Sequence, residues 1–325
     1  MDISLIICTR NRAGQLEQCL HALEQVEKPD ADVEVILVDN NSTDETNSVM
    51  RRYTERSKWL VRQTFCARPG LGAARNVGIG ASRGELIVFT DDDCYLEPHY
   101  FLNLRQRFHP KLCQYGMGQI LVHDPADDER VASLKINRTR LLMPRMSVVP
   151  AGSIQGANMF FLRRVFDAVG MFDEEMGAGT PFPCEDIEMA CRASHHGFTG
   201  ALLPGFTVYH HHGRKRGSPE AESTVSSYDT GRGAYYASLL ARGDFRAWHY
   251  WDNTFRDGLL AGDRKTFDQL ARELAGASRY VEHYARQAAL SNQPISDTSN
   301  NLWMLCKKAH NRLKVALATM RHMPR

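Results

Sequence analysis

The sequence lacks the features that mark membrane-spanning, disulfide-rich and nucleic-acid-binding proteins. Its 325 residues contain no apolar run of about 18 residues, so we expect no membrane-spanning helix. Its 8 cysteines form no C-x-x-C pair, which argues against a zinc site or a disulfide framework and makes a reducing cytoplasm the expected location. The 40 basic and 38 acidic side chains nearly cancel, so no overall charge attracts nucleic acid.

The first residues also lack the pattern of a secretion signal. The acidic Asp2 stands where a signal peptide carries basic residues, and the apolar run that follows it is short. We therefore expect residues 3–9 to form a buried first strand. A chain of this length can bury one substantial core and still carry a smaller appended unit.

The first 122 residues alternate between strand-like and helix-like patterns. Apolar, β-branched runs predict strands at residues 3–9, 33–38, 60–66, 86–90 and 115–122. Helical spacing or helix-start signals lie between them, at residues 16–26, 71–81 and 98–108 and at a Ser-x-x-Glu capping box in residues 42–45. This alternation predicts an α/β fold with a mostly parallel, Rossmann-type sheet flanked by helices.

The pattern changes after residue 123. It predicts a helix near residues 131–142, a strand at 157–162, a short helix at 185–194, a strand at 206–209 and a mobile loop at 213–227. The remaining residues have helical spacing.

Polar residues stand where three of the predicted strands end. Thr9, Asp39 and Asp91 are these residues. Because ligands of such sheets bind beyond the carboxyl ends of the strands, we expect the three to converge on one site. Asp92 and Asp93 follow Asp91, and three adjacent carboxylates repel one another unless a cation is bound. Mg²⁺ or Mn²⁺ fits such oxygen ligands, whereas an N-cap followed by a solvated acidic loop is the alternative.

Several segments together resemble the family-2 nucleotide-sugar glycosyltransferases. They stand in the order and spacing of that family and cover about residues 1–215; they are residues 6–12, 38–46, 72–78, 89–93, 156–158, 169–173, 185–186 and 208–210. The resemblance implies a GT-A fold and an inverting, metal-dependent transfer of a sugar from a nucleotide diphosphate donor, with UDP as the expected nucleotide. The acceptor would be a hydroxyl of a growing glycan or lipid-linked saccharide, as in polysaccharide biosynthesis.

The resemblance also implies a domain organisation. Residues 1–215 would form the transferase domain, with a nucleotide-binding half at 1–122 and an acceptor-binding half at 123–215. Residues 216–325 would form a helical C-terminal extension.

The resemblance assigns a set of residues to the donor. Asp39 would accept the N–H of a uracil-type base, and Arg75 would lie against the base or the phosphates. The full set expected to bind nucleotide or donor sugar is Thr9, Arg10, Asn11, Asp39, Arg75, Asp91, Asp92, Gly156 and Asn158. A turn at Asp39, a surface ion pair for Arg75 and a plain turn at Gly156 remain the alternatives.

The metal ligands implied by the resemblance are Asp93 and one histidine. Of the triplet His210-His211-His212, at most two can face one site, because neighbouring strand residues point to opposite faces. His210 matches the family position, and His212 is the alternative. The expected cofactor is Mn²⁺ or Mg²⁺.

The acids Glu185 and Asp186 open a predicted helix. Acids in a first helical turn are favoured by the helix dipole, so a capping role is the alternative to catalysis. The resemblance implies that Asp186 is the general base for the attacking hydroxyl and that Glu185 orients the acceptor or metal-bound groups.

Other classes of protein fit less well. A dinucleotide-dependent oxidoreductase would carry G-x-G-x-x-G after the first strand, and Tyr95 breaks the D-x-D-x-[TV] pattern of haloacid-type phosphohydrolases. A sugar-phosphate nucleotidyltransferase would carry a glycine-rich basic loop where this chain has Cys8 to Asn11. A nucleotide-sugar-binding protein that has lost catalysis remains the non-enzymatic alternative.

Two further expectations concern the C-terminal extension. Its aromatic-rich helices would pack in a core, cover the acceptor or form a homodimer contact. Residues 302–325 mix apolar and basic side chains, which is typical of a helix on an anionic membrane surface, here the inner face of the plasma membrane. A solvated terminal helix is the alternative.

Overall fold

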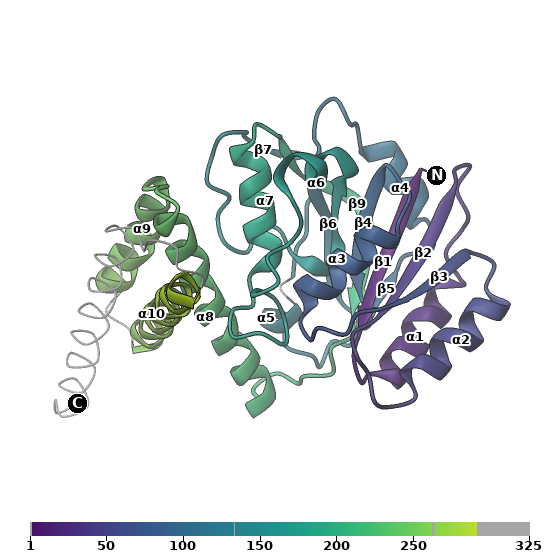
Figure 1. Cartoon of the computed structure of the whole chain (residues 1–325), viewed down its shortest axis with the longest axis horizontal. Coiled ribbons are helices and arrows are strands. Elements are labelled where there is room, and N and C mark those ends of the chain that lie inside the picture. The colour runs from purple at the N-terminus through teal and green to yellow at the C-terminus, as the bar shows by residue number, and fades with distance from the viewer. Residues whose placement is uncertain (1, 133, 262–263, 291–325) are drawn as a thin grey trace. The chain divides into compact units, whose positions relative to one another are not determined.

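The computed structural model describes residues 2–132, 134–261 and 264–290 (Figure 1). The chain forms two compact units. The first extends to Thr180 and includes Glu185–Glu222, and the second comprises Pro181–Cys184 and the chain from Ser223. The first unit contains the sheet, so it is described first.

A nine-stranded sheet organises the first unit. Its strands are β1 (Ile3–Thr9), β2 (Val33–Asp39), β3 (Leu60–Phe65), β4 (Leu86–Asp91), β5 (Cys94–Leu96), β6 (Tyr115–Val122), β7 (Leu141–Met143), β8 (Met159–Leu162) and β9 (Gly200–His210). They lie in the order β3-β2-β1-β4-β8-β6-β9-β5, and β7 pairs with β9.

The parallel part of the sheet is limited to two regions. Strands β1 to β4 pair in parallel, as do β6 and β9, whereas β8, β5 and β7 pair antiparallel with their neighbours. The predicted α/β sheet is therefore present, but it is mixed beyond β4. Strand β2 is buried along its whole length, as expected for a parallel strand covered on both faces.

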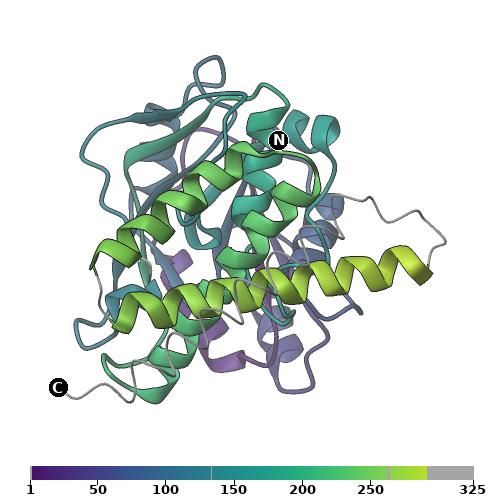
Figure 2. The same cartoon turned by 90° about the vertical axis from the view of Figure 1, so that its left-hand side faces the viewer.

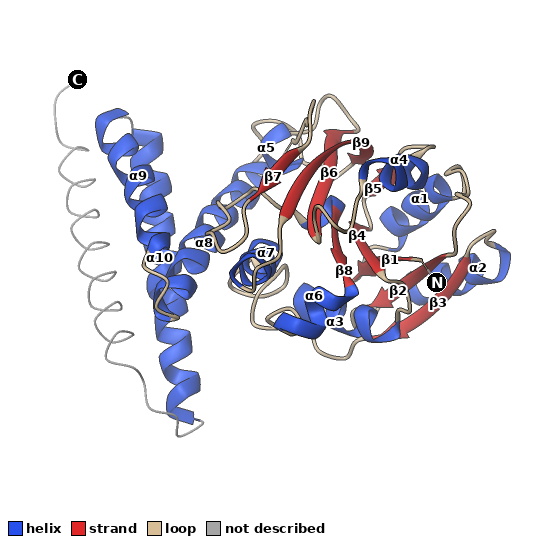
Figure 3. Ribbon diagram, turned by 90° about the horizontal axis from the view of Figure 1, so that it is seen from above, coloured by secondary structure: helices blue, strands red, loops and turns tan. Residues whose placement is uncertain are grey.

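Helices cover both faces of this sheet (Figure 3). Helices α1 (Ala13–Leu23), α2 (Thr46–Arg56) and α4 (Tyr100–Arg107) lie on one face, and α3 (Leu71–Ala81), α6 (Arg163–Val169) and α7 (Glu185–His195) lie on the other. Short helices at α5 (Glu129–Ala132) and η1 (Gly156–Asn158) complete the unit.

Three predictions of local structure were wrong. The helix expected at residues 131–142 ends at Ala132, because the following chain bridges from Lys135 to Ile120 and then forms β7 on the edge of β9. The capping box of residues 42–45 does not form: α2 starts at Thr46, whose N–H is bound by Asp44 Oδ1 at 3.1 Å. The loop expected at residues 213–227 gives way to α8 (Pro219–Ala241), since proline suits a first helical turn.

Helices α8, α9 (Arg246–Ala261) and α10 (Arg264–Leu290) supply most of the second unit, drawn green to yellow in Figure 2. Its interior contains a buried acid: Glu273 is inaccessible to solvent and accepts hydrogen bonds from Arg232 (2.7 Å) and from Trp251 Nε1 (3.0 Å). Trp251 also stacks on Tyr236. These aromatic residues thus pack in a core, while the expected homodimer contact stays a prediction.

Two observations bear on membranes and disulfides. None of the helices in the described part of the chain combines the length and apolarity of a membrane-spanning segment. The membrane-surface helix expected at residues 302–325 lies outside the described residues. The seven cysteines within the described ranges are free thiols.

Candidate active site

The strand register brings the predicted strand-end residues to one edge of the sheet. Thr9 is the register partner of Asp39 on β2, and Cys8 is the partner of Asp91 on β4. Only Asp92 and Asp93 separate β4 from β5, so the three acids form a tight turn at this edge. The expected convergence is confirmed.

Asp93 is held by a histidine and an arginine. Its Oδ1 lies 3.2 Å from His210 Nε2, and its Oδ2 accepts a hydrogen bond from the guanidinium of Arg12. Burial alone would raise the pKa of Asp93, but the hydrogen bonds and positive charges of His210 and Arg12 outweigh it and hold the pKa well below its usual range. Asp93 is therefore an ionised carboxylate.

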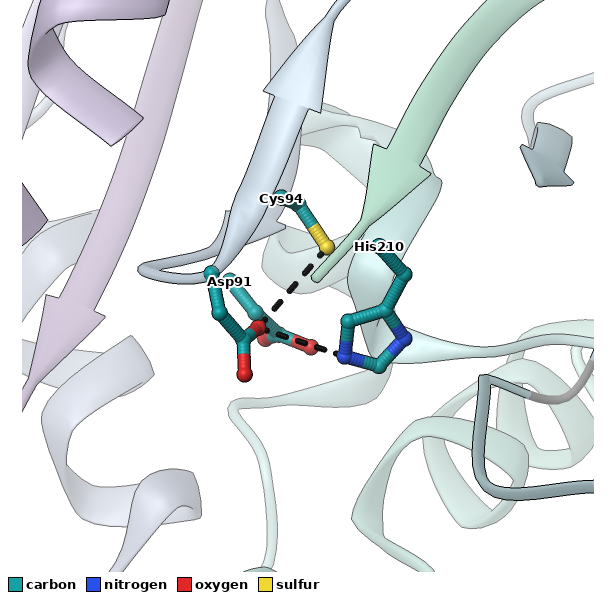
Figure 4. A group of neighbouring side chains, drawn as sticks. Asp91, Cys94 and His210 are labelled. Atoms are coloured by element: carbon teal, nitrogen blue, oxygen red, sulfur yellow. Dashed lines mark hydrogen bonds and ion pairs between the residues drawn. The ribbon is translucent and has the colours of Figure 1, made fainter. Parts of the chain in front are cut away.

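A candidate metal site forms around this carboxylate. One ligand atom from each of Asp91, Asp93, Cys94 and His210 lies within 4.8 Å of the others (Figure 4). Burial holds the pKa of the Cys94 thiol well above its usual range, so the thiol stays protonated and is a poor ligand for a hard cation. The two carboxylates and the imidazole nitrogen fit Mn²⁺ or Mg²⁺.

His212 takes no part in this cluster. Its Nε2 lies 3.2 Å from the backbone oxygen of Asp128, and its Nδ1 accepts the N–H of Arg214 at 3.0 Å. Both ring nitrogens are thus engaged: Nε2 reaches the backbone of Asp128, and Nδ1 binds within its own loop. Of the two predicted alternatives, the geometry favours His210 as the metal ligand.

Asp92 fixes the acidic turn to β1. Its Oδ2 accepts a hydrogen bond from Thr9 Oγ1 (2.7 Å), and its Oδ1 lies 3.0 Å from Arg12 Nε. Burial raises the pKa of Asp92 to about 7, although the positive charge of Arg12 opposes this shift. Thr9 and Asp92, both among the residues predicted to bind the donor, are engaged with each other here.

Arg12 is a site residue that the sequence did not single out. It stands in the same segment as Thr9, and it neutralises both Asp92 and Asp93. Its place just after the first strand was visible in the sequence. Its partners lie 80 or more residues away, and only the strand register reveals them.

Arg75 links the acidic turn to the start of α7. This side chain is 2% exposed; its Nη1 forms an ion pair with Glu185, and its Nη2 lies 3.6 Å from Asp91 Oδ1. The guanidinium also lies 5.7 Å from the ring centres of Phe89 and of Phe172. The alternative of a surface ion pair is wrong, because this charge is buried.

Gly156 makes room for this arginine. A Cβ atom at residue 156 would overlap the guanidinium of Arg75. The absence of a side chain therefore has a steric cause at this position, beyond an ordinary turn.

Asp186 lies beside this network and is partly exposed. Its Oδ2 accepts the N–H of Gly156 (2.9 Å), and its Oδ1 accepts the N–H of Ile187 (2.7 Å). Burial and then the charge of Glu185 raise the pKa of Asp186 to about 7, against the opposing effects of Arg75 and the two backbone hydrogen bonds. The bond to Ile187 resembles a cap, whereas a near-neutral pKa suits a general base.

Asp39 and Asn11 shape the loops that follow β1 and β2. Asp39 is buried, and its Oδ1 accepts the N–H of Ser42 at 2.9 Å, which is the turn foreseen as the alternative. Asn11 has a φ of 53° and accepts the N–H of Thr43 at 2.7 Å, so it joins the loop after β1 to the loop after β2. Arg10 is exposed next to it.

Asn158 lies in the interior. It is inaccessible to solvent, accepts a hydrogen bond from the hydroxyl of Tyr100 (2.6 Å), and donates to the backbone oxygens of Gln119 (2.8 Å) and Phe206 (3.2 Å). These bonds use both of its N–H groups. The contact with a donor sugar predicted for Asn158 is therefore wrong in this conformation, and its role is structural.

The sequence matches one family and several of its members. The family model described as "Glycosyl transferase family 2" matches residues 4–170, just over half of the chain. The chain is 32% identical over 99 residues to the uncharacterised glycosyltransferase alr2836 of Nostoc sp., covering 30% of each protein. It is 35% identical over 97 residues to glycosyltransferase AglE of Haloferax volcanii, covering 30% of this chain and 31% of that protein.

A third relative is the poly(ribitol-phosphate) β-N-acetylglucosaminyltransferase TarS of Staphylococcus aureus. It is 31% identical over 96 residues, covering 30% of this chain and 17% of TarS. These alignments thus span less than a third of each relative.

Solved structures share the fold. The mannosyltransferase PcManGT of Pyrobaculum calidifontis, in complex with GDP-Man and Mn²⁺, superposes with a TM-score of 0.57 at 17% identity, covering 98% of this chain and 86% of that one. S. aureus TarS superposes with a TM-score of 0.55 at 16% identity, covering 94% and 55% of the two chains. At these identities the likeness concerns the fold alone.

Proposed function

Because the chain belongs to glycosyl transferase family 2, we propose that it transfers a sugar from a nucleotide diphosphate donor to an acceptor hydroxyl. The observation that carries the proposal is the placement of a metal-ligand cluster, Asp91, Asp93 and His210, at the carboxyl ends of the parallel strands. Ligands of such sheets bind at that edge.

The proposed donor site spans the edge from β2 to β4. Asp39 lies at its base end, and a uracil N–H would find the Asp39 carboxylate as an acceptor, which supports UDP as the nucleotide. A divalent cation held by Asp93 and His210, with Asp91 beside them, would neutralise the charge on the departing diphosphate. The TarS structure with UDP-GlcNAc and the PcManGT structure with GDP-Man and Mn²⁺ support this class of donor.

The proposed general base is Asp186. The acceptor oxygen would form its bond to the anomeric carbon as the bond from that carbon to the diphosphate breaks, and the hydroxyl proton would pass to Asp186. Attack from the side opposite the leaving group inverts the anomeric configuration. Partial exposure and a pKa of about 7 support this role, since a base of that pKa is half ionised at neutral pH.

Arg75 and Glu185 act in this proposal as positioning residues. Arg75 contacts Asp91 on the donor side and Glu185 on the acceptor side. Gly156 then binds the carboxylate of Asp186 through its backbone. The base is thus oriented by a backbone N–H next to the arginine that contacts Asp91 and Glu185.

The acceptor class is the least constrained part of the proposal. The name of TarS states that it acts on poly(ribitol phosphate), and we propose by analogy a growing glycan or a lipid-linked saccharide for this chain. A contact of residues 302–325 with the membrane would bring the enzyme to such an acceptor.

The proposal is tested by donor hydrolysis. Purified protein is incubated with Mn²⁺ and a panel of nucleotide sugars, and wild type is compared with Asp93→Ala and with Asp30→Ala, which removes an exposed acid away from the site. We expect metal-dependent release of one nucleotide diphosphate, lost only in Asp93→Ala. Formation of a nucleoside triphosphate and a sugar 1-phosphate from the nucleotide sugar, only when pyrophosphate is added, would instead indicate a nucleotidyltransferase.

A silent panel is resolved by calorimetry with UDP, GDP and dTDP in the presence of Mn²⁺. Binding without turnover, even when candidate acceptors are added, would indicate a binding protein that has lost catalysis. No binding of any of the three nucleotides would contradict the transferase proposal.

A further inference from the structure

The three histidines that follow one another at the end of β9 have three different surroundings. His210 faces the acidic cluster, and His212 is buried between two loops. His211 is partly exposed and lies near two other rings, those of His123 and Tyr95. The proposed transfer reaction uses neither His211 nor His123.

The strand register places the two imidazoles side by side. Strands β6 and β9 are parallel and pair Val122 with His210, so His123 and His211 occupy the next position on each strand. Their ring centres are 4.8 Å apart, and the ring planes are inclined by 44°. His123 is exposed, so the pair is accessible from solvent.

Tyr95 fixes the proton of His211. The hydroxyl of Tyr95 donates to Oε1 of Gln18 at 2.8 Å, which uses its single proton. The same oxygen lies 2.8 Å from Nδ1 of His211, so it accepts the Nδ1–H of the imidazole. This tautomer leaves a lone pair on Nε2 of His211. A ring nitrogen bound to an oxygen acceptor, with the other nitrogen free, is the usual arrangement of a metal-binding histidine.

We propose that His123 and His211 form a second cation site, specific for a transition-metal ion such as Zn²⁺. Two neutral imidazoles suit zinc, nickel or copper, whereas Mg²⁺ and Mn²⁺ prefer the oxygen ligands of the acidic cluster. Water would complete the coordination. The site is separate from the acidic cluster because His211 follows His210 in an extended chain and points to the other face.

The second site is coupled to the first through the backbone. The N–H of His211 donates to the backbone oxygen of Asp93 at 2.8 Å, and the N–H of His123 donates to that of His210 at 3.0 Å. A cation bound by both imidazoles would therefore link the ends of β6 and β9 directly behind the residues that hold the first cation.

The test is a titration of the full chain with Zn²⁺ alone, with the number of bound ions measured by calorimetry and by metal analysis after dialysis. We expect two sites in wild type, because His210 and Asp93 also offer ligands to zinc. His123→Ala should remove one site, His210→Ala should remove the other, and the double variant should bind none. His99→Ala, which removes an exposed histidine away from both sites, should keep two.

Two further measurements separate metal binding from a structural role. Tyr95→Phe should keep the number of sites but weaken zinc binding at the second site about tenfold, because the Nδ1–H of His211 loses its acceptor. Zinc should also raise the melting temperature of His210→Ala, which keeps the second site. It should not raise the melting temperature of the double variant His123→Ala/His210→Ala. Equal stoichiometry and affinity in wild type and His123→Ala would overturn the proposal, whatever the donor experiments show.

Discussion

The guanidinium of Arg75 forms a buried ion pair with Glu185, although the two residues lie 110 positions apart in the sequence. The pair joins α3 to the first turn of α7, and Asp91 lies 3.6 Å from the same guanidinium. One side chain thereby connects the acid of the metal cluster with the helix that carries Asp186.

We expect Arg75→Met to destabilise the protein by about 3–5 kcal/mol, because it leaves the buried carboxylate of Glu185 without a partner. The double variant Arg75→Met/Glu185→Gln should recover most of this stability, since residue 185 then carries no charge that needs a partner. Transfer activity should stay low in both variants. Urea unfolding and initial rates measure the two effects; recovery of activity in the double variant would show that Arg75 has no role beyond stability.

Gly156→Ala tests the steric requirement beside Arg75. The added methyl group would overlap the guanidinium, so Arg75 must move away from Asp91 and Glu185. We expect a loss of activity of at least tenfold in kcat. Gly80→Ala is the matched control: its Cβ meets nothing within 4 Å, and in a helix alanine should stabilise by about 0.5–1 kcal/mol. Equal activity of Gly156→Ala and wild type would count against the positioning role.

The pH dependence of activity should follow Asp186. Its pKa is raised to about 7, so the base form becomes populated as pH rises through that value, and kcat should rise with it. Asp186→Asn should remove the activity at every pH while leaving Mn²⁺ binding intact. A flat profile between pH 6 and about 8 would contradict the assignment of Asp186 as the base.

The raised pKa of Asp186 also affects stability, and stability should fall as pH rises, whereas activity should increase. Between its ordinary pKa of 3.8 and about 7, the folded protein holds a proton on Asp186 that the unfolded chain releases. Stability of the metal-free protein should therefore fall as pH rises across this window and level off above it. Asp186→Asn should show a smaller decrease in urea unfolding measured across the window, because Asp92, whose pKa is also raised to about 7, still contributes to it. An identical slope in wild type and Asp186→Asn would show that Asp186 does not hold this proton.

Arg12→Ala should weaken the metal-free protein more than the metal-bound one. Without metal, Arg12 supplies positive charge to both Asp92 and Asp93, and its loss leaves two buried acids side by side. We expect a destabilisation of about 1.5–3 kcal/mol, partly reversed by saturating Mn²⁺. Arg10→Ala, which removes an exposed neighbour, should change neither value. A loss unaffected by Mn²⁺ would indicate that Arg12 stabilises the loop alone.

The sequence predicts the parts of this molecule that depend on local pattern. The alternation of apolar runs identifies β1 to β4, and the polar residues at their ends identify the edge that carries the site. The pairing of Arg12 with Asp93 cannot be predicted in this way, because it depends on which strands become neighbours.

The failures have the same origin. A helix was expected near residues 131–142 from their spacing, but the bridge from Lys135 to Ile120 and the pairing of β7 with β9 outweigh a weak helical preference. Asn158 stands in a segment typical of donor binding, yet tertiary packing buries it against Tyr100. Local pattern carries no information on either outcome.

The acidic turn between β4 and β5 is short, and the number of its residues matters as well as their chemistry. Only two residues join β4 to β5, and side chains alternate along β5, with Cys94 and Leu96 buried and Tyr95 turned outward. One inserted residue would reverse this alternation, burying the tyrosine and exposing the thiol. The inner face of β5 would lose its packing and the outer face would lose Tyr95 at the same time, so insertions here should be far less tolerated than substitutions.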